Sequence, residues 1–298
     1  MSGMRLPKPA SAVVLGLGLL SAGCTITVNS QSEIVREEKK FTVDGRADLR
    51  LTTFDGSIEI RSWDRPDVVV EIEKRGPTKE SIEALQIVAE QKGSLIEIEV
   101  KRARSESFSI GLRRSASAKL IANVPRDTDI RARSGDGSIR ADRLSGRIDL
   151  RTGDGSIRAS DIAGNLTFDT GDGSITIEGA EGELVLDTGD GSVNVSGKLG
   201  AIKLHTGDGS ITYRAERGSA MTGPWEITTG DGGVTLYLPP DFSADLDAHT
   251  GDGTIRNDLN VEGEGEERQR RTLRGKIGSG GPVLRVRTGD GAIRFKTN

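Results

Sequence analysis

The feature that most constrains this chain is a six-residue motif, Thr-Gly-Asp-Gly-Ser-Ile, that recurs at a fixed interval of 18 positions. Its regular copies carry the aspartates Asp136, Asp154, Asp172, Asp190 and Asp208. Looser copies follow at Asp231, Asp252 and Asp290, and an isolated early copy lies at Asp55. A period this short predicts a stack of repeats rather than a globule around one central core.

Within each repeat, the apolar residues predict two short strands. They recur every nine positions and have an apolar partner two residues later, as in Ile157 with Ala159 and Leu166 with Phe168. Residues i and i+2 share a face in a strand because successive side chains alternate. Polar residues fall between them, so each strand has one dry face and one wet face.

Two glycine-containing corners separate the strands. In the Gly-Asp-Gly-Ser corner we expect glycines such as Gly153 and Gly155 to adopt positive φ, and the aspartate to bond nearby backbone amides. The other corner carries a glycine every 18 positions, as at Gly146 and Gly164. Antiparallel hairpins would also need a turn every nine residues. A coil is favoured because it stacks like residues about 4.8 Å apart at the full period.

We therefore predict an all-β, right-handed parallel β-solenoid with 18-residue coils of two short strands each. The handedness follows from the usual chirality of parallel crossovers. A thin core suits a chain that is only 3% aromatic. The threonines Thr152, Thr170, Thr188 and Thr206 are expected to form a polar ladder.

The N-terminus has the pattern of an export signal. Arg5 and Lys8 precede an apolar run at 10–20, which is too short to span a membrane and ends in Leu-Ser-Ala-Gly-Cys. This ending resembles the lipobox of bacterial lipoproteins, although Ser21 replaces the more usual Leu. The resemblance implies a signal peptide at 1–23 and a lipid on Cys24; the alternative is an ordinary cleaved signal. Thr25 slightly favours the outer membrane over retention at the inner membrane.

The rest of the chain divides by pattern. Residues 24–40 are polar and are expected to be a tether. Residues 41–130 are predicted to be a less regular β-rich part that caps the first coil and contains one short helix within 78–91. Residues 131–298 are predicted to be the regular solenoid, with a mobile insert at 257–282 that is rich in Gly and Glu and then basic.

The candidate site residues are the corner aspartates. Stacked carboxylates repel one another, and calcium would relieve that repulsion. The pattern is similar to the 18-residue coil of calcium-binding β-rolls, but the second corner has no constant acid, and calcium takes six or more oxygens. A structural turn is therefore preferred to a metal site. The eight candidates are Asp136, Asp154, Asp172, Asp190, Asp208, Asp231, Asp252 and Asp290.

Other chemistry is poorly supported by the sequence. His205 and His249 occupy a position that holds Arg or Asp in other repeats, so we expect them to face water. No catalytic set with a Ser, Cys or His nucleophile or base can be assembled. The Gly-Asp-Gly-Ser corners lead into strands, unlike phosphate-binding loops. A net charge of −4 and an export signal argue against nucleic-acid binding.

The repeats also resemble a known group. Val124-Pro125, the serial Thr-Gly-Asp-Gly-Ser-Ile units and the late Tyr237-Leu238-Pro239-Pro240 resemble the bacterial "putative adhesin" domains of unknown function, close to the head-GIN domains. The resemblance covers about 41–298. It implies a β-solenoid of the cell envelope and carries no catalytic residues.

Together these observations favour a non-catalytic, lipid-anchored envelope protein that acts as an adhesin or binding scaffold. Its partners would be the membrane, through the lipid, and an envelope protein or glycan, bound on a flat face bearing Arg151, Asp169, Asp187 and His205. No cofactor is expected, with calcium at the corner aspartates as the less favoured alternative. The alternatives are a calcium-binding β-roll-like spacer, an envelope-stress scaffold that contacts a sensor through 257–282, and a polysaccharide-active β-helix enzyme.

Overall fold

The structure is a computed structural model that describes residues 24–29, 32–102, 116–263 and 271–298. The predicted signal peptide at 1–23 lies outside the described residues. No helix in the described part is long and apolar enough to cross a membrane.

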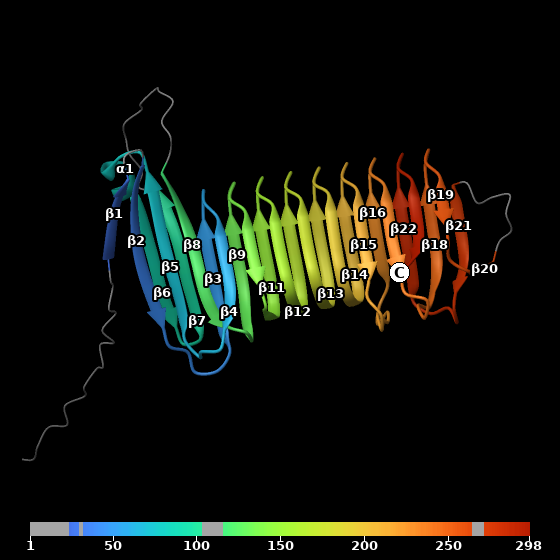
Figure 1. Cartoon of the computed structure of the whole chain (residues 1–298), viewed down its shortest axis with the longest axis horizontal. Coiled ribbons are helices and arrows are strands. Elements are labelled where there is room, and N and C mark those ends of the chain that lie inside the picture. Colours follow the sequence, from blue (N-terminus) through green and yellow to red (C-terminus); the bar gives the residue numbers. More distant parts are fainter. Residues whose placement is uncertain (1–23, 30–31, 103–115, 264–270) are drawn as a thin grey trace, which may run out of the picture.

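The chain forms an elongated β-solenoid, as the repeat predicts (Figure 1). Each coil has one limb that enters the Gly-Asp-Gly corner and one that leaves it, called here the entry limb and the exit limb. The entry limb contains β3 (Ala47–Thr53), β9 (Thr128–Ser134), β11 (Ser145–Thr152), β16 (Trp225–Thr229), β22 (Val283–Thr288) and β18 (Ala244–Thr250). The exit limb contains β4 (Ile58–Trp63), β10 (Ile139–Asp142), β15 (Ile211–Ala215), β17 (Val234–Leu238), β23 (Ile293–Thr297) and β19 (Ile255–Asn257). In the centre, β12 (Ile157–Thr170), β13 (Ile175–Thr188) and β14 (Val193–Thr206) each run from an exit limb into the next entry limb.

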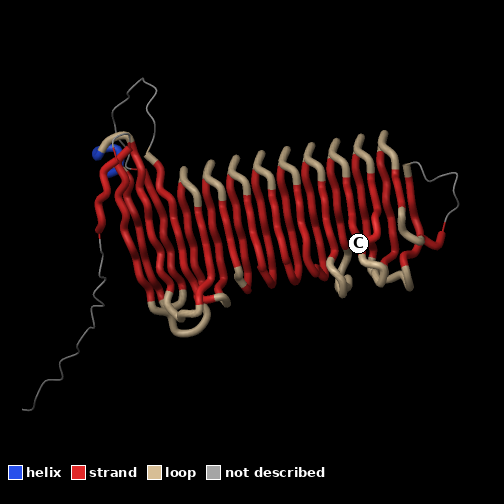
Figure 2. Tube along the Cα trace, viewed as in Figure 1, coloured by secondary structure: helices blue, strands red, loops and turns tan. Residues whose placement is uncertain are grey.

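Neighbouring coils pair in parallel at the register that the repeat predicts. In β12 and β13, Ile157 lies beside Ile175 and Phe168 beside Leu186. The Gly-Asp-Gly corners form a regular row of loops along one edge (Figure 2). The backbone thus stacks equivalent residues along both limbs of the regular coils, although the register shifts between β13 and β14 at the corner that holds Gly182.

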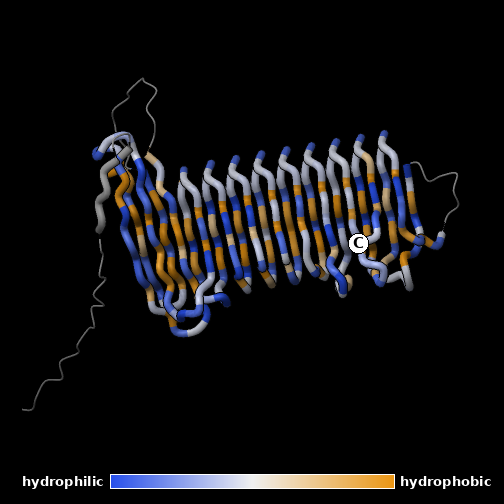
Figure 3. Tube along the Cα trace, viewed as in Figure 1, coloured by the Kyte–Doolittle hydropathy of each residue, from blue (hydrophilic) through white to orange (hydrophobic). Residues whose placement is uncertain are grey.

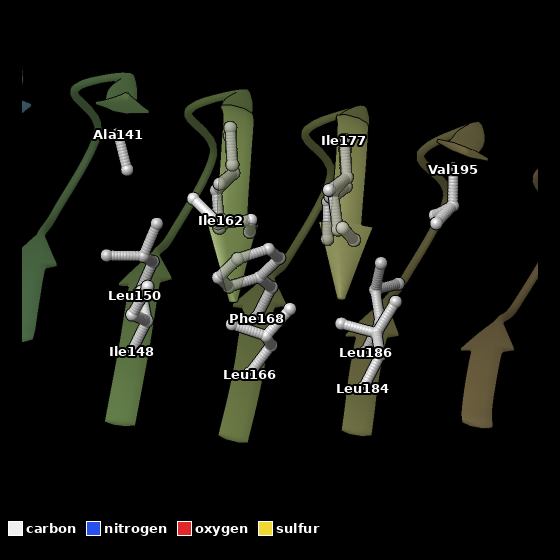
Figure 4. Close-up of a cluster of buried hydrophobic side chains, with 14 of the residues drawn as sticks. Ala141, Ile148, Leu150, Ile162, Leu166, Phe168, Ile177, Leu184, Leu186 and Val195 are labelled. Carbon is white, nitrogen blue, oxygen red and sulfur yellow. The ribbon is translucent and has the colours of Figure 1, made fainter. Parts of the chain in front are cut away.

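The core is the narrow space between the two limbs. Figure 4 shows Ile148 and Leu150, or Leu166 and Phe168, on one limb, with Ala141 and Ile177 on the other. All six are buried. Apolar and polar bands alternate along the strands in Figure 3, because each strand buries one face in the core and exposes the other to solvent.

The prediction of positive φ at the Gly-Asp-Gly corners is wrong for Gly153 and Gly155, since neither has a φ in that region. Glycine is needed there because the coils approach closely: a β-carbon at Gly155 would lie 2.3 Å from the carbonyl oxygen of Gly137. Positive φ occurs at the opposite corner, for example at Gly146 (φ 144°) and Gly164 (φ 118°). The two corners therefore use glycine for different physical reasons.

The N-terminal part extends both limbs and covers the first coil. Its elements are β1 (Cys24–Asn29), β2 (Ser32–Phe41), β5 (Val68–Gly76), α1 (Lys79–Glu83), β6 (Leu85–Lys92), β7 (Leu95–Arg102) and β8 (Ser117–Pro125). The exit limb continues through β8, β5, β2 and β1, and the entry limb continues through β7 and β6.

Two expectations for this region need correction. The residues expected to be a tether form β1 and β2 instead. Although its side chains are largely polar, the backbone of β2 pairs with β5 along 33–41. The helix is real but shorter than the pattern at 78–91: Thr78 caps it through Ser81, and it ends at Glu83. Ile87 and Val88 belong to β6, whose pairing with β7 overrides their helical spacing.

The last coils are not stacked in chain order. The final strands β22 and β23 lie between the coil of β16 and β17 and the coil of β18 and β19. The insert expected to be mobile at 257–282 contains β20 (Val261–Gly263) and β21 (Thr272–Ile277). β21 pairs with β18, and β20 pairs with β21, so the two strands extend the entry limb at this end; residues 264–270 lie outside the described part.

Candidate functional site: the corner row and the outer face of the entry limb

The Gly-Asp-Gly corners are joined from coil to coil by buried hydroxyl groups. The hydroxyl of Thr170 donates to the carbonyl oxygens of Gly153 (3.1 Å) and Gly155 (2.8 Å) in the preceding coil. A hydroxyl also accepts from its own corner, as Thr206 does from the amide of Gly209 at 3.2 Å. The buried members of this threonine ladder, in spatial order, are Thr53, Ser134, Thr152, Thr170, Thr188, Thr206, Thr229, Thr288 and Thr250. The predicted ladder is therefore longer than the sequence indicates.

The corner aspartates lie at the tips of this row and face solvent. All eight candidates, from Asp136 to Asp290, are exposed. The corner hydrogen bonds described above come from threonine hydroxyls and glycine amides, so they need no aspartate. Asp252 has an ion pair with Arg271 at 3.2 Å.

The row offers single carboxylates rather than clustered ones. In the described part of the chain, no group of three or more His, Cys, Asp or Glu residues is placed to hold a metal ion. Adjacent tips are about one strand spacing apart, roughly 4.8 Å. Calcium needs six to eight oxygens, so the tips alone do not make a complete calcium site.

The two histidines face outward from the entry limb. His205 is exposed and lies in register between Asp187 and Thr228. His249 is also exposed, and its Nδ1 lies 3.0 Å from the hydroxyl of Thr272. Both positions agree with the expectation that they face water.

The outer face of the entry limb carries a continuous polar row immediately before the threonine ladder. In spatial order this entry-face row is Arg133, Arg151, Asp169, Asp187, His205, Thr228, Arg287 and His249. The structure thus brings together the four face residues expected from the sequence. It also adds Arg287 and His249 in an order that the sequence does not show.

Ion pairs connect the strands of this face. Asp149 lies 2.8 Å from Arg151 and 3.6 Å from Arg131. At the far end, Asp247 accepts hydrogen bonds from Arg287 and from Arg274. Partial burial acts to raise the pKa of Asp247, but the hydrogen bonds and charges of these two arginines outweigh it and hold the pKa below its usual value.

A hollow lies at the N-terminal end of this face. This hollow has a volume of about 330 Å³ and is lined by polar groups that include Arg50, Glu97, Arg131 and Arg133. Arg50 is bonded there to Glu97 at 3.0 Å. Sequence reasoning missed these contacts, because only the coil register places β7 beside β3.

The geometry defines an all-β solenoid with polar, regularly spaced outer faces. Residues 47–296 match the family model described as Toastrack DUF4097. The chain therefore belongs to the Toastrack DUF4097 family. A comparison with functionally curated proteins finds no match.

Several solved structures are similar to this chain at low sequence identity. One is described as a putative lipid binding protein from Parabacteroides distasonis, with 12% identity, 87% of this chain and 96% of that chain covered, and a TM-score of 0.46. Another is a putative adhesin from Bacteroides fragilis, with 11% identity, the same coverages and a TM-score of 0.42. A putative cell adhesion protein from Clostridium sporogenes has 16% identity, 88% and 100% coverage and a TM-score of 0.28.

Proposed function

We propose that this protein is a non-catalytic binding module of the bacterial cell envelope, anchored by a lipid on Cys24. The observation that carries the binding role is the entry-face row, in which side chains such as Arg151, Asp169 and His205 are held in register by parallel strands. A rigid polar face costs little conformational entropy when a partner binds.

The proposed anchor rests on the N-terminal sequence. A short apolar run after Arg5 and Lys8 ends in Ser-Ala-Gly-Cys, with the only cysteine of the chain at Cys24. Cys24 is also the first residue of β1, so an anchor there would hold the N-terminal end of the solenoid close to the membrane. We favour an outer-membrane location because Thr25 follows the cysteine.

The anchor is tested by feeding cells that express the full chain with an alkyne-labelled fatty acid. The wild type is expected to carry the label and to sediment with membranes, and Cys24→Ser is expected to lose both properties. Ser21→Leu is the matched control, since it restores the more usual lipobox residue and should keep the label. Labelling of Cys24→Ser would contradict the proposed anchor.

The binding role is tested with purified full-length protein and sedimented envelope fragments. Replacing three face residues (Asp169→Asn, Asp187→Asn, His205→Gln) should lower retention on the fragments several-fold. The control replaces three corner tips instead (Asp154→Asn, Asp172→Asn, Asp190→Asn). Equal retention of both variants would show that the entry-face row is not the binding surface.

A further inference from the structure

The outer face of the exit limb carries, near its C-terminal end, a cluster of cations without carboxylate partners in the described part of the chain. On the entry limb, arginines such as Arg151, Arg285 and Arg287 are each paired with a carboxylate. On the exit limb, near its C-terminal end, lie Arg214, Arg256, Arg294 and Lys296. Within the described residues, none of these four cations has a carboxylate oxygen within 4.0 Å.

These cations are held side by side by the strand register. Arg294 on β23 lies directly beside Arg256 on β19. Tyr237 on β17 lies between Arg214 on β15 and Lys296 on β23. The Arg214 guanidinium is 3.9 Å and the Lys296 ammonium 5.5 Å from the centre of the tyrosine ring. We call these five residues the exit-face patch.

The patch is an unfavourable arrangement for the free protein. Like charges on directly opposed strand residues are destabilising, and the strands place Arg256 and Arg294 only about 4.8 Å apart. Stacking on Tyr237 orients Arg214 and Lys296 but does not neutralise them. Glu216 and Asp258 follow the ends of β15 and β19, and neither forms an ion pair with the patch. A bound polyanion would remove the repulsion.

We propose that the exit-face patch binds an extended acidic polysaccharide through its repeated carboxylate groups. Arginine suits this role because its planar donors match carboxylate geometry. The patch spans four adjacent strands of a flat face and exposes no large apolar side chain that could insert into a lipid bilayer. The patch therefore fits a polysaccharide that runs across the strands.

The position of the patch also favours a polysaccharide over a lipid surface, and this step rests on the proposed anchor at Cys24. The strands of the patch lie at the end of the solenoid opposite β1 (Figure 1). From β4 to β19 the exit limb spans eight strand spacings, roughly 40 Å at about 4.8 Å each. The patch would thus lie at the end of the solenoid that is distant from the proposed anchor.

The test measures binding of full-length protein to polygalacturonate, a polysaccharide with one carboxylate per sugar. The test variant is Arg256→Gln, Arg294→Gln, Lys296→Gln. The matched control removes three charges from the entry limb and its extension β21 instead (Arg147→Gln, Lys203→Gln, Lys276→Gln), all outside the entry-face row and none with a carboxylate partner among the described residues. Thermal melts of both variants check that each is folded.

The wild type and the control are expected to bind, with affinity that falls as salt is added. The test variant should bind about tenfold more weakly, which corresponds to about 1.4 kcal/mol. Absence of wild-type binding, equal binding by the test variant, or an equal loss in the control would overturn the proposal. Patch-dependent binding to phosphatidylglycerol vesicles without binding to polygalacturonate would also overturn it.

The envelope-fragment assay separates this inference from the proposed function. Retention on envelopes without polygalacturonate binding would refute the polysaccharide site and leave the binding module intact. Polygalacturonate binding by a protein that is not retained on envelopes would support the polysaccharide site and refute the proposed envelope-binding role.

Discussion

The hydroxyl of Thr288 donates a hydrogen bond to the carbonyl oxygen of Gly232 at 2.8 Å, although 56 positions separate the two residues. This contact places the last coil of the chain directly on the coil of β16 and β17. The coil of β18 and β19, which precedes it in sequence, stacks on its other side. Removal of the final strands should therefore disrupt two coils.

Deletion of residues 283–298 removes β22 and β23, with four buried apolar side chains: Leu284, Val286, Ile293 and Phe295. We expect β18 and β19 to lose protection from amide hydrogen exchange, because their parallel partners are gone. Protection of β12 and β13 should persist, since repeat proteins are stabilised by nearest-neighbour contacts. Undiminished protection at 244–257 would contradict the observed stacking order.

Thr188→Val is expected to destabilise the protein by about 1–3 kcal/mol in chemical denaturation. The substitution keeps the side-chain shape but leaves the carbonyl of Gly173, 3.0 Å from the hydroxyl, without its donor. Thr188→Ser is the control. Serine already fills this place at Ser134, where it donates to Gly56 at 2.9 Å. A larger loss for Ser than for Val would show that packing, not hydrogen bonding, governs the ladder.

Gly191→Ala should cost at least about 3 kcal/mol, the upper range of single-substitution effects. The new β-carbon would lie 2.0 Å from the backbone oxygen of Gly173, which cannot rotate away. Gly93→Ala provides the comparison, because nothing lies within 4 Å and only its φ of +63° opposes a side chain. That strain costs about 1–2 kcal/mol. Similar melting temperatures for the two variants would refute the close-approach explanation.

Asp247→Asn should lower the free energy of unfolding by about 1 kcal/mol at neutral pH, because Asp247 is bonded to Arg274 and Arg287 on neighbouring strands. The folded-state pKa of Asp247 is depressed. Its stabilising contribution is therefore present above the unfolded-state pKa, about 3.9, and is lost as the pH falls through the folded-state pKa.

Denaturation of wild type and Asp247→Asn across pH 2 to 7 checks this dependence. The difference between them should shrink as the pH falls below about 4. Asp187→Asn serves as the control, since Asp187 is exposed on the same face. A difference that grows in acid would contradict the assigned ion pairs.

Millimolar calcium is expected to leave the melting temperature of the full chain nearly unchanged relative to EDTA. Each corner presents one exposed carboxylate, and a hydroxyl and an amide already bond corner carbonyls such as that of Gly153. An upward shift of more than a few degrees would instead identify the corner tips as ion sites, since ligand binding raises stability by mass action.

Much of the solenoid could be predicted from the sequence because the spacing of the repeat determines which residues of adjacent coils lie side by side. Ile157 and Ala159, or Thr152 and Thr170, recur at the spacing that parallel stacking requires. The register between regular coils follows from that spacing, and so does the exposure of the corner aspartates.

Other features depend on contacts that no local pattern contains. The helical spacing of Ile87 and Val88 competes with the pairing of β6 to β7, and the pairing prevails. The sequence indicates that the corner glycines are turn residues. The structure shows that glycine is required there because a β-carbon would collide with the backbone of the neighbouring coil. Arg214 and Lys296 flank Tyr237 only because the last coil is placed next to β17.

The stacking order also bears on how the molecule is made. A chain synthesised from its N-terminus can add coils one after another through β17, since each finds its partner already in place. The next coil, β18 and β19, has no pairing partner when it is made, because β22 and β23, which separate it from β16 and β17, come later in the chain. Folding of this end must therefore wait for β22 and β23, so these two strands are a condition for a finished solenoid.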